Sequence, residues 1–170
     1  MEKNKKIPLN ENLKLIVCVG ENNLIGDKYP SGNGMLWQIK EELLYFKEIT
    51  LGNTLLFGAS TAKVVPIELM KKNREVIILH RNMNIPDLIK KLSSENKNIF
   101  ICGGASIYKY FLDNFEIGEI YLSKIKKNVE VKHANEPLYF PNIEKYGYEI
   151  SSCKEFEEFT AYIYRLKNKN

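Results

Sequence analysis

The chain has 170 residues, 44% of them hydrophobic and 27% charged, and its formal net charge is +4. This length suits one globular domain with a substantial core, and so small a positive charge does not favour a nucleic-acid-binding protein. The three cysteines form no CxxC pair, so a metal site is not expected. No apolar run resembles a signal peptide or a membrane span, so we expect a reduced, cytoplasmic compartment.

The N-terminal part of the sequence predicts an extension, a strand and a loop. Residues 1–13 are polar and are expected to form a flexible extension to a domain that spans residues 14–170. The apolar run KLIVCVG, residues 14–20, predicts a strand buried on both faces. Turn-forming residues crowd positions 27–34 and predict a loop, and loops at strand ends often carry function.

The stretch from Met35 to Gly58 predicts a helix and then a buried strand, with Gly52 just beyond the helix end. At about 100° per residue, Glu42 falls inside an apolar arc of this helix. The residues of that arc are Ile39, Phe46, Ile49 and Thr50. A carboxylate there is costly unless it is paired, protonated or bound to a ligand. The helix alone leaves open the alternative that it is rotated and Glu42 reaches water.

Two later strands run through glycines into a helix start, an arrangement that suits a bound phosphate. The first passes through Gly58, after which Ser60 or Thr61 is expected to cap a helix, and the second passes through Gly103–Gly104. The other buried strands are predicted at residues 75–79 and 119–125, with a helix at 86–92 and a closing hairpin at 148–153 and 160–166.

This order of elements predicts the fold class. Strands alternate with helices and two strands close the chain. We therefore expect a single α/β domain with a central, mostly parallel mixed β-sheet flanked by helices and a C-terminal antiparallel hairpin.

An ordered set of segments resembles dihydrofolate reductase over roughly residues 14–166: LIVCVGENNLIG, MLW, EELLYFKEIT, LLFG, ICGGASIYKYFL and IYLSKI. The resemblance implies that family's fold and NADPH as cofactor. It implies hydride transfer that reduces 7,8-dihydrofolate to tetrahydrofolate in one-carbon metabolism. It also implies dihydrofolate and antifolate inhibitors as ligands, without nucleic-acid or membrane partners, and a monomer is the default expectation.

The resemblance also implies roles for particular residues around the substrate. Glu42 takes the place of the carboxylate that orients and polarises the pterin while a water delivers the proton, Trp37 lies beside the pterin, and Ser123 hydrogen-bonds the carboxylate. Arg74 takes the place of the arginine that pairs with the carboxylate of the glutamate tail. The other implied substrate positions are Ile16, Val17, Leu43, Phe46, Val65 and Leu69.

Further positions carry over to the cofactor. Cys18 and Ile25 flank the nicotinamide and Tyr108 lies near it, while His80 and Arg81 reach the adenosine 2′-phosphate. The remaining implied cofactor positions are Gly26, Gly58, Ser60, Thr61, Cys102, Gly103, Gly104, Ala105, Ser106 and Ile107. The resemblance implies a cis peptide between the paired glycines.

Some positions depart from the family pattern. Leu36 replaces the proline before the tryptophan, and Ala59 replaces an arginine that contacts cofactor phosphate, which leaves the preference for NADPH over NADH open. Pro137 and Leu138 stand where an acidic residue is expected, so the loop before them is not expected to attach to the Asp27–Leu36 loop in the usual way.

Two alternatives to a dihydrofolate reductase remain. One is a reductase of the same fold that acts on a ribosylaminopyrimidine of riboflavin synthesis, and the other is a non-catalytic nucleotide-binding relative. Arg74 and the spacing from MLW to EELLYF favour dihydrofolate reductase over the riboflavin enzyme, whose substrate has no glutamate tail.

Overall fold

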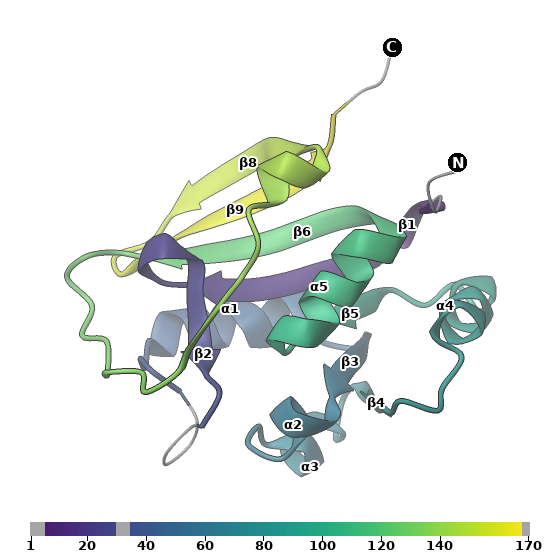
Figure 1. The fold of residues 1–170 in the computed structure, drawn as a ribbon, viewed down its shortest axis with the longest axis horizontal. Coiled ribbons are helices and arrows are strands. Elements are labelled where there is room, and N and C mark those ends of the chain that lie inside the picture. Colours follow the sequence, from purple (N-terminus) through teal and green to yellow (C-terminus); the bar gives the residue numbers. More distant parts are fainter. Residues whose placement is uncertain (1–5, 30–34, 168–170) are drawn as a thin grey trace.

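The computed structural model describes residues 6–29 and 35–167 of the chain. Its main sheet has seven strands in the order β4-β3-β5-β1-β6-β9-β8 (Figure 1). From β4 to β6 the neighbouring strands run parallel, and β9 and β8 complete the sheet antiparallel. The bounds are β1 (Ile7–Val19), β3 (Thr54–Gly58), β4 (Glu75–Leu79), β5 (Ile99–Ile101), β6 (Phe115–Ile125), β8 (Tyr148–Glu155) and β9 (Phe159–Leu166). The predicted α/β class and closing hairpin are confirmed.

Helices cover both faces of this sheet. They are α1 (Lys40–Thr50), α2 (Ala59–Ala62), α3 (Ile67–Met70), α4 (Ile85–Ser94) and α5 (Ala105–Asn114), with short 3₁₀ turns η1 (Glu21–Asn23) and η2 (Ile143–Tyr146). Figure 1 shows α5 in front of the sheet and α1 behind it. Within the described residues, no helix combines the length and apolarity needed to cross a membrane.

The alternation of side chains along β1 separates the two faces. Leu15 and Val17 pack in the core that includes α4 and α5, whereas Ile16 packs in a second core with Phe46 of α1. Successive strand residues point to opposite faces, so a strand buried on both sides needs apolar residues without interruption. This is the pattern that the sequence showed for residues 14–20.

The N-terminal boundary of β1 differs from the expectation. Residues 7–13, expected in a loose extension, belong to β1, and Ile7 pairs with Phe115 of β6. The register of β1 against β6 shifts on both sides of Asn10, and these irregularities break the alternation that marks a strand in sequence. Gly118 allows the close approach, because a Cβ there would lie 2.9 Å from the Asn10 carbonyl oxygen.

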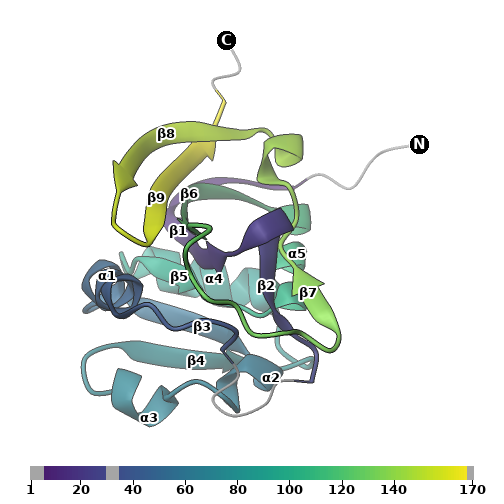
Figure 2. The ribbon, with the colours of Figure 1, turned by 90° about the vertical axis from the view of Figure 1, so that its left-hand side faces the viewer.

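A second sheet has only two strands. It pairs β2 (Leu24–Asp27) antiparallel with β7 (Pro137–Tyr139), and Figure 2 shows them side by side. The sequence did not predict this pair, because strands this short carry too few residues for a periodic pattern.

The ends of α1 and α2 can be compared with the ends that the sequence predicted. Helix α1 starts at Lys40, so the segment from Met35 to Ile39 is not helical. Gly52 has a φ of 75° just beyond α1, as expected for a residue after a helix C-terminus. Helix α2 begins directly after Gly58, without a side-chain cap, so the expected capping by Ser60 or Thr61 is wrong.

Candidate active site

The two glycine turns meet at the carboxyl ends of β3 and β5, which are neighbouring parallel strands. The Gly58 N–H donates to the Gly103 carbonyl oxygen at 2.7 Å. A Cβ on Gly58 would lie 2.8 Å from Ile107, and one on Gly104 would lie 2.8 Å from the Thr61 hydroxyl oxygen. The peptide between Gly103 and Gly104 is cis, as the resemblance implied. Ligands of open α/β sheets bind at this edge, where strands end.

Helix α5 presents its N-terminus at the same edge. Gly104 is its N-cap, and the Tyr108 N–H donates to the Gly104 carbonyl oxygen at 2.9 Å to close the first turn. The N–H groups that precede such a bond have no partner within the helix and favour an anion. Ala105 and Ser106 lie in this first turn. The glycine turns and this helix start fit a bound dinucleotide phosphate.

Glu42 lies in the first turn of α1 and is part-buried, whereas its neighbour Glu41 is exposed. Burial raises the pKa of the Glu42 carboxyl. Among the described residues, no lysine or arginine forms an ion pair with it. Glu42 is thus more buried than its neighbour on the same turn, as the helical count predicted, and part of its surface still reaches solvent.

Trp37 and Ser123 lie on the α1 side of the sheet. Trp37 is 7% exposed and packs in a group that we call the Trp37 cluster: Leu36, Trp37, Ile39, Ile125, Phe159 and Ala161. Ser123 is 4% exposed and pairs with Cys18 across β6 and β1, so both side chains point to the same face. Burial and the charge of Glu42 raise the pKa of the Cys18 thiol, while a hydrogen bond from Trp37 opposes the rise.

Tyr108 joins α5 to β1. Its hydroxyl donates to the Ile16 carbonyl oxygen at 2.8 Å, and its ring meets Phe140 edge-on. Burial raises the pKa of Tyr108, and charges on Cys102, Cys18 and Glu42 raise it further. The Tyr108 hydroxyl lies beside the second glycine turn, because a Cβ on Gly103 would lie 3.3 Å from its oxygen.

Arg74 is held against the C-terminal end of α1. Its Nε donates to the Thr50 hydroxyl at 2.9 Å and its Nη2 donates to the Lys47 carbonyl oxygen at 2.8 Å, while Nη1 donates to the Asn73 side chain. A cation at this end of a helix is favourable. The guanidinium is thus placed by the same helix that carries Glu42.

The structure brings some of the remaining predicted residues together and leaves others apart. Ile16, Phe46 and Val65 share one apolar cluster on the α1 side. Leu43 and Leu69 are 41% and 55% exposed, and the Val17 side chain points to the opposite face of the sheet.

The remaining cofactor positions lie at turns and strand ends. His80 and Arg81 are exposed directly after β4. Ile25 packs against the core next to Gly26 in β2, and Cys102 follows β5 with its thiol donating to the Phe100 carbonyl oxygen.

Asp27, at the end of β2, has a role that the sequence did not predict. Its carboxylate accepts from the Asn135 N–H at 2.8 Å and from the Glu136 and Tyr29 N–H groups at 3.0 Å. The hydrogen bonds from Tyr29 and Glu136 lower the pKa of Asp27. The loop before Pro137 is therefore attached to the end of β2, with the carboxylate supplied by Asp27. The signal in sequence was an aspartate at the start of a turn, since Asp often accepts from an N–H further along.

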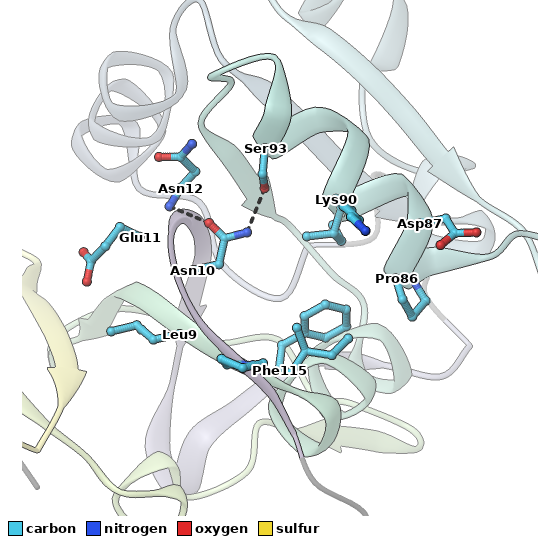
Figure 3. Close-up of a pocket in the computed structure, with 12 residues that line it drawn as sticks. Leu9, Asn10, Glu11, Asn12, Pro86, Asp87, Lys90, Ser93 and Phe115 are labelled. Atoms are coloured by element: carbon cyan, nitrogen blue, oxygen red, sulfur yellow. Dashed lines mark hydrogen bonds between the residues drawn. The ribbon is translucent and has the colours of Figure 1, made fainter.

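A separate pocket of about 520 Å³, shown in Figure 3, lies where β1 and β6 begin. The start of β1, helix α4 and Phe115 line it. The Asn10 side chain crosses it to donate to the Ser93 hydroxyl at 2.7 Å. None of the residues implied for substrate or cofactor lines this pocket. It is therefore not part of the candidate active site.

Comparison with known proteins finds similarity to one family over nearly the whole chain. The family described as dihydrofolate reductase matches residues 12–168. The chain is 30% identical over 170 residues to the dihydrofolate reductase of Mycoplasma genitalium, which covers 91% of this chain and 98% of that protein. It is 29% identical to dihydrofolate reductase type 6 of Proteus mirabilis (91% and 96% covered) and 26% identical to type 1 of Escherichia coli (92% and 98%).

Proposed function

We infer, because this chain belongs to the dihydrofolate reductase family, that it is an NADPH-dependent oxidoreductase that reduces 7,8-dihydrofolate to 5,6,7,8-tetrahydrofolate. The observation that supports this most directly is the part-buried carboxylate of Glu42, which forms no ion pair with a lysine or arginine of residues 6–29 or 35–167. A buried carboxylate without a cation suits a ligand that brings its own N–H donors.

Glu42 is proposed to hold the pterin. The 2-amino group and N3–H of that ring would donate to the two carboxylate oxygens and favour the charged form against burial. The carboxylate then orients the ring and polarises it toward protonation at N5, and a water delivers the proton. Trp37 and Ser123 are proposed to limit and order the solvent on this side.

NADPH supplies the hydride. The first turn of α5, with Ala105, Ser106 and Ile107, is proposed to hold one cofactor phosphate, and the turn from Gly58 to Thr61 to hold another. His80 and Arg81, exposed at the end of β4, are proposed to reach the 2′-phosphate of the adenosine.

Arg74 is proposed to bind the carboxylate of the glutamate tail. Its hydrogen bonds to Thr50 and the Lys47 carbonyl fix the guanidinium at the end of α1. A fixed fork loses little side-chain freedom when it pairs with a carboxylate.

The test is turnover of dihydrofolate, measured as oxidation of NADPH, for the wild type and for Glu42→Gln. The substitution keeps the shape and removes the charge, so we expect kcat/KM to fall by roughly 10²–10⁴-fold with a retained circular dichroism spectrum. Absence of turnover by the wild type contradicts the proposed activity. Turnover of a ribosylaminopyrimidine in place of dihydrofolate favours the riboflavin alternative, and antifolate binding without turnover favours a non-catalytic relative.

A further inference from the structure

Three aromatic rings join helix α1 to the turn between β8 and β9. Phe156 and Phe159 of this turn stack with their ring centroids 4.3 Å apart and their planes at 6°. The Tyr45 ring of α1 meets Phe156 edge-on at 5.7 Å and lies 5.9 Å from Phe159. Figure 2 shows the turn beside α1. We call these three residues the Tyr45 ring cluster, and it connects segments that are far apart in the sequence.

The hairpin turn is itself fixed to the end of β6. The Phe156 N–H donates to the Phe159 carbonyl oxygen at 2.9 Å and closes the turn. Lys126, directly after β6, donates from its ammonium group to the Phe156 carbonyl oxygen at 2.5 Å and from its N–H to the Glu158 carbonyl oxygen at 2.8 Å. Phe159 is fully buried and pairs with Ile125 of β6. The two phenylalanine rings therefore give Tyr45 a fixed surface to pack on.

The first turn of α1 depends on packing, because no side chain caps it. The N-cap residue, Ile39, makes no side-chain hydrogen bond, and the Leu43 N–H closes the turn by donating to the Ile39 carbonyl oxygen at 3.1 Å. Ile39 is buried in the Trp37 cluster, and Tyr45 packs against the same cluster. Tyr45 follows Glu42 by three residues, and residues at that spacing are neighbours on a helix surface. A change in the packing of Tyr45 should therefore displace Glu42.

We propose that Tyr45 is a positioning residue, which holds the first turn of α1, and with it Glu42, against the turn between β8 and β9. Tyr45 acts through Glu42 and has no contact with the ligands. A displacement of about 1 Å at a reacting group can cost about 10²-fold in rate, so a contact that fixes this helix bears on turnover. The catalytic meaning rests on the role proposed for Glu42, whereas the contact itself rests on the ring distances.

The first measurement needs no ligand. It is hydrogen exchange at the Leu43 amide, which reports opening of the first turn of α1. Phe156→Leu removes the ring that Tyr45 meets edge-on, and we expect exchange at Leu43 to accelerate about 2–10-fold, as for the loss of one aromatic pair. Tyr45→Leu should do the same, and Tyr45→Phe, which keeps the ring, should restore the wild-type rate. Unchanged exchange in Phe156→Leu, or equal acceleration in Tyr45→Phe, overturns the proposal.

The second measurement is turnover of dihydrofolate in a double-mutant cycle. Tyr45→Leu and Phe156→Leu should each lower kcat/KM about tenfold, and Tyr45→Phe should restore it. In a Glu42→Gln background, Tyr45→Leu should cause little further loss, because the carboxylate through which it acts is already absent. Wild-type turnover by Tyr45→Leu, or losses from Tyr45→Leu and Glu42→Gln that simply multiply, contradict a role through Glu42.

Tyr110→Leu is the matched control. Tyr110 is also a part-buried helical tyrosine, and it contacts two phenylalanine rings, Phe111 at 5.3 Å and Phe115 at 6.3 Å. It lies on α5, across the sheet from α1 (Figure 1). We expect this variant to lose stability as Tyr45→Leu does, while exchange at Leu43 and kcat/KM stay at wild-type values. Equal losses in Tyr110→Leu overturn the specific role of Tyr45.

The two measurements separate this inference from the proposed function. A wild-type protein that does not turn over dihydrofolate contradicts the proposed function, and the exchange data still decide whether the hairpin turn holds α1. Normal turnover by the wild type, with exchange at Leu43 that ignores Phe156→Leu, leaves the proposed function intact and removes the role of Tyr45.

Discussion

At the scale of single residues, Glu42 has opposite effects on stability and function. Burial raises the pKa of its carboxyl in the folded chain, so the charged form is less favourable there than in the unfolded chain. The contribution of this carboxyl to stability is fully present when the pH is below its pKa in the unfolded chain. It is lost as the pH rises through its raised pKa in the folded chain. Active sites often carry such a cost.

The raised pKa of Glu42 predicts that Glu42→Gln changes stability as well as activity. Near neutral pH the variant should be more stable than the wild type by about 1 kcal/mol, or roughly 2–4 °C in melting temperature. The difference should vanish at acid pH, where the wild-type carboxyl is neutral. Thermal melts of both proteins across pH check it, with Glu41→Gln as an exposed control on the same turn. A variant that is less stable at neutral pH contradicts the placement.

Arg74 combines a structural role with a proposed role in binding. Arg74→Lys keeps the charge but loses the fork that contacts Thr50 and the Lys47 carbonyl. We expect KM for dihydrofolate to rise about tenfold, corresponding to one lost charge-assisted hydrogen bond, with kcat little changed. A pteridine substrate without the glutamate tail should be unaffected, and an equal loss for that substrate indicates damage to α1 instead.

Ala59 bears on the choice of cofactor. It is exposed at the start of α2, directly after Gly58, which pairs with Leu79 next to His80, where the 2′-phosphate is proposed to bind. Ala59→Arg should increase the preference for NADPH over NADH about tenfold, because an added guanidinium favours the extra phosphate. The ratio of kcat/KM for the two cofactors measures this, and Ala59→Gln separates charge from length. An unchanged ratio contradicts the proposed location of the phosphate.

At the scale of elements, Asp27 connects the small sheet to a long polar loop. Its carboxylate accepts from Tyr29 next to β2 and from Asn135 and Glu136 before β7. A second link runs from the Lys28 N–H to the Glu136 carbonyl oxygen at 2.9 Å. The pKa of this carboxyl is lower in the folded chain than in the unfolded chain. The carboxylate therefore stabilises the attachment when the pH is above its pKa in the unfolded chain, and this effect is lost as the pH falls through its pKa in the folded chain.

We expect Asp27→Ala to loosen this attachment without unfolding the main sheet. The backbone N–H groups of Asn135 and Glu136 lose their acceptor, so their hydrogen exchange should accelerate about tenfold or more. The amides of β1 should keep their protection. Glu130→Gln, an exposed change in the same loop, is the control. Unchanged exchange at Asn135 indicates that the carboxylate does not hold the loop.

At the scale of the whole molecule, β1 is the element that both faces share. Its side chains enter the cores on each side of the sheet, and it pairs with β5 and β6. The second glycine turn follows β5, a neighbour of this strand, and Tyr108 donates to the Ile16 carbonyl oxygen within it. Ligand binding at the carboxyl edge should therefore stabilise the domain as a unit.

This arrangement predicts additive thermal shifts. NADPH at about 100 times its Kd should raise the melting temperature by roughly 5–10 °C in one cooperative transition. Glu42→Gln should keep this shift and lose most of the further shift from dihydrofolate. If the variant loses the NADPH shift as well, the carboxylate does not act on the substrate alone.

The sequence by itself determined the parts of this protein that depend on local pattern. Apolar runs marked most strands of the main sheet, a helical count placed Glu42 on an apolar face, and glycines marked the turns after β3 and β5. Only the tertiary structure decided the start of β1, the small sheet and the hydrogen bond from the Asn135 N–H to the Asp27 carboxylate. Each of these pairs residues that are distant in sequence or irregular in register, and periodicity carries no information about such partners.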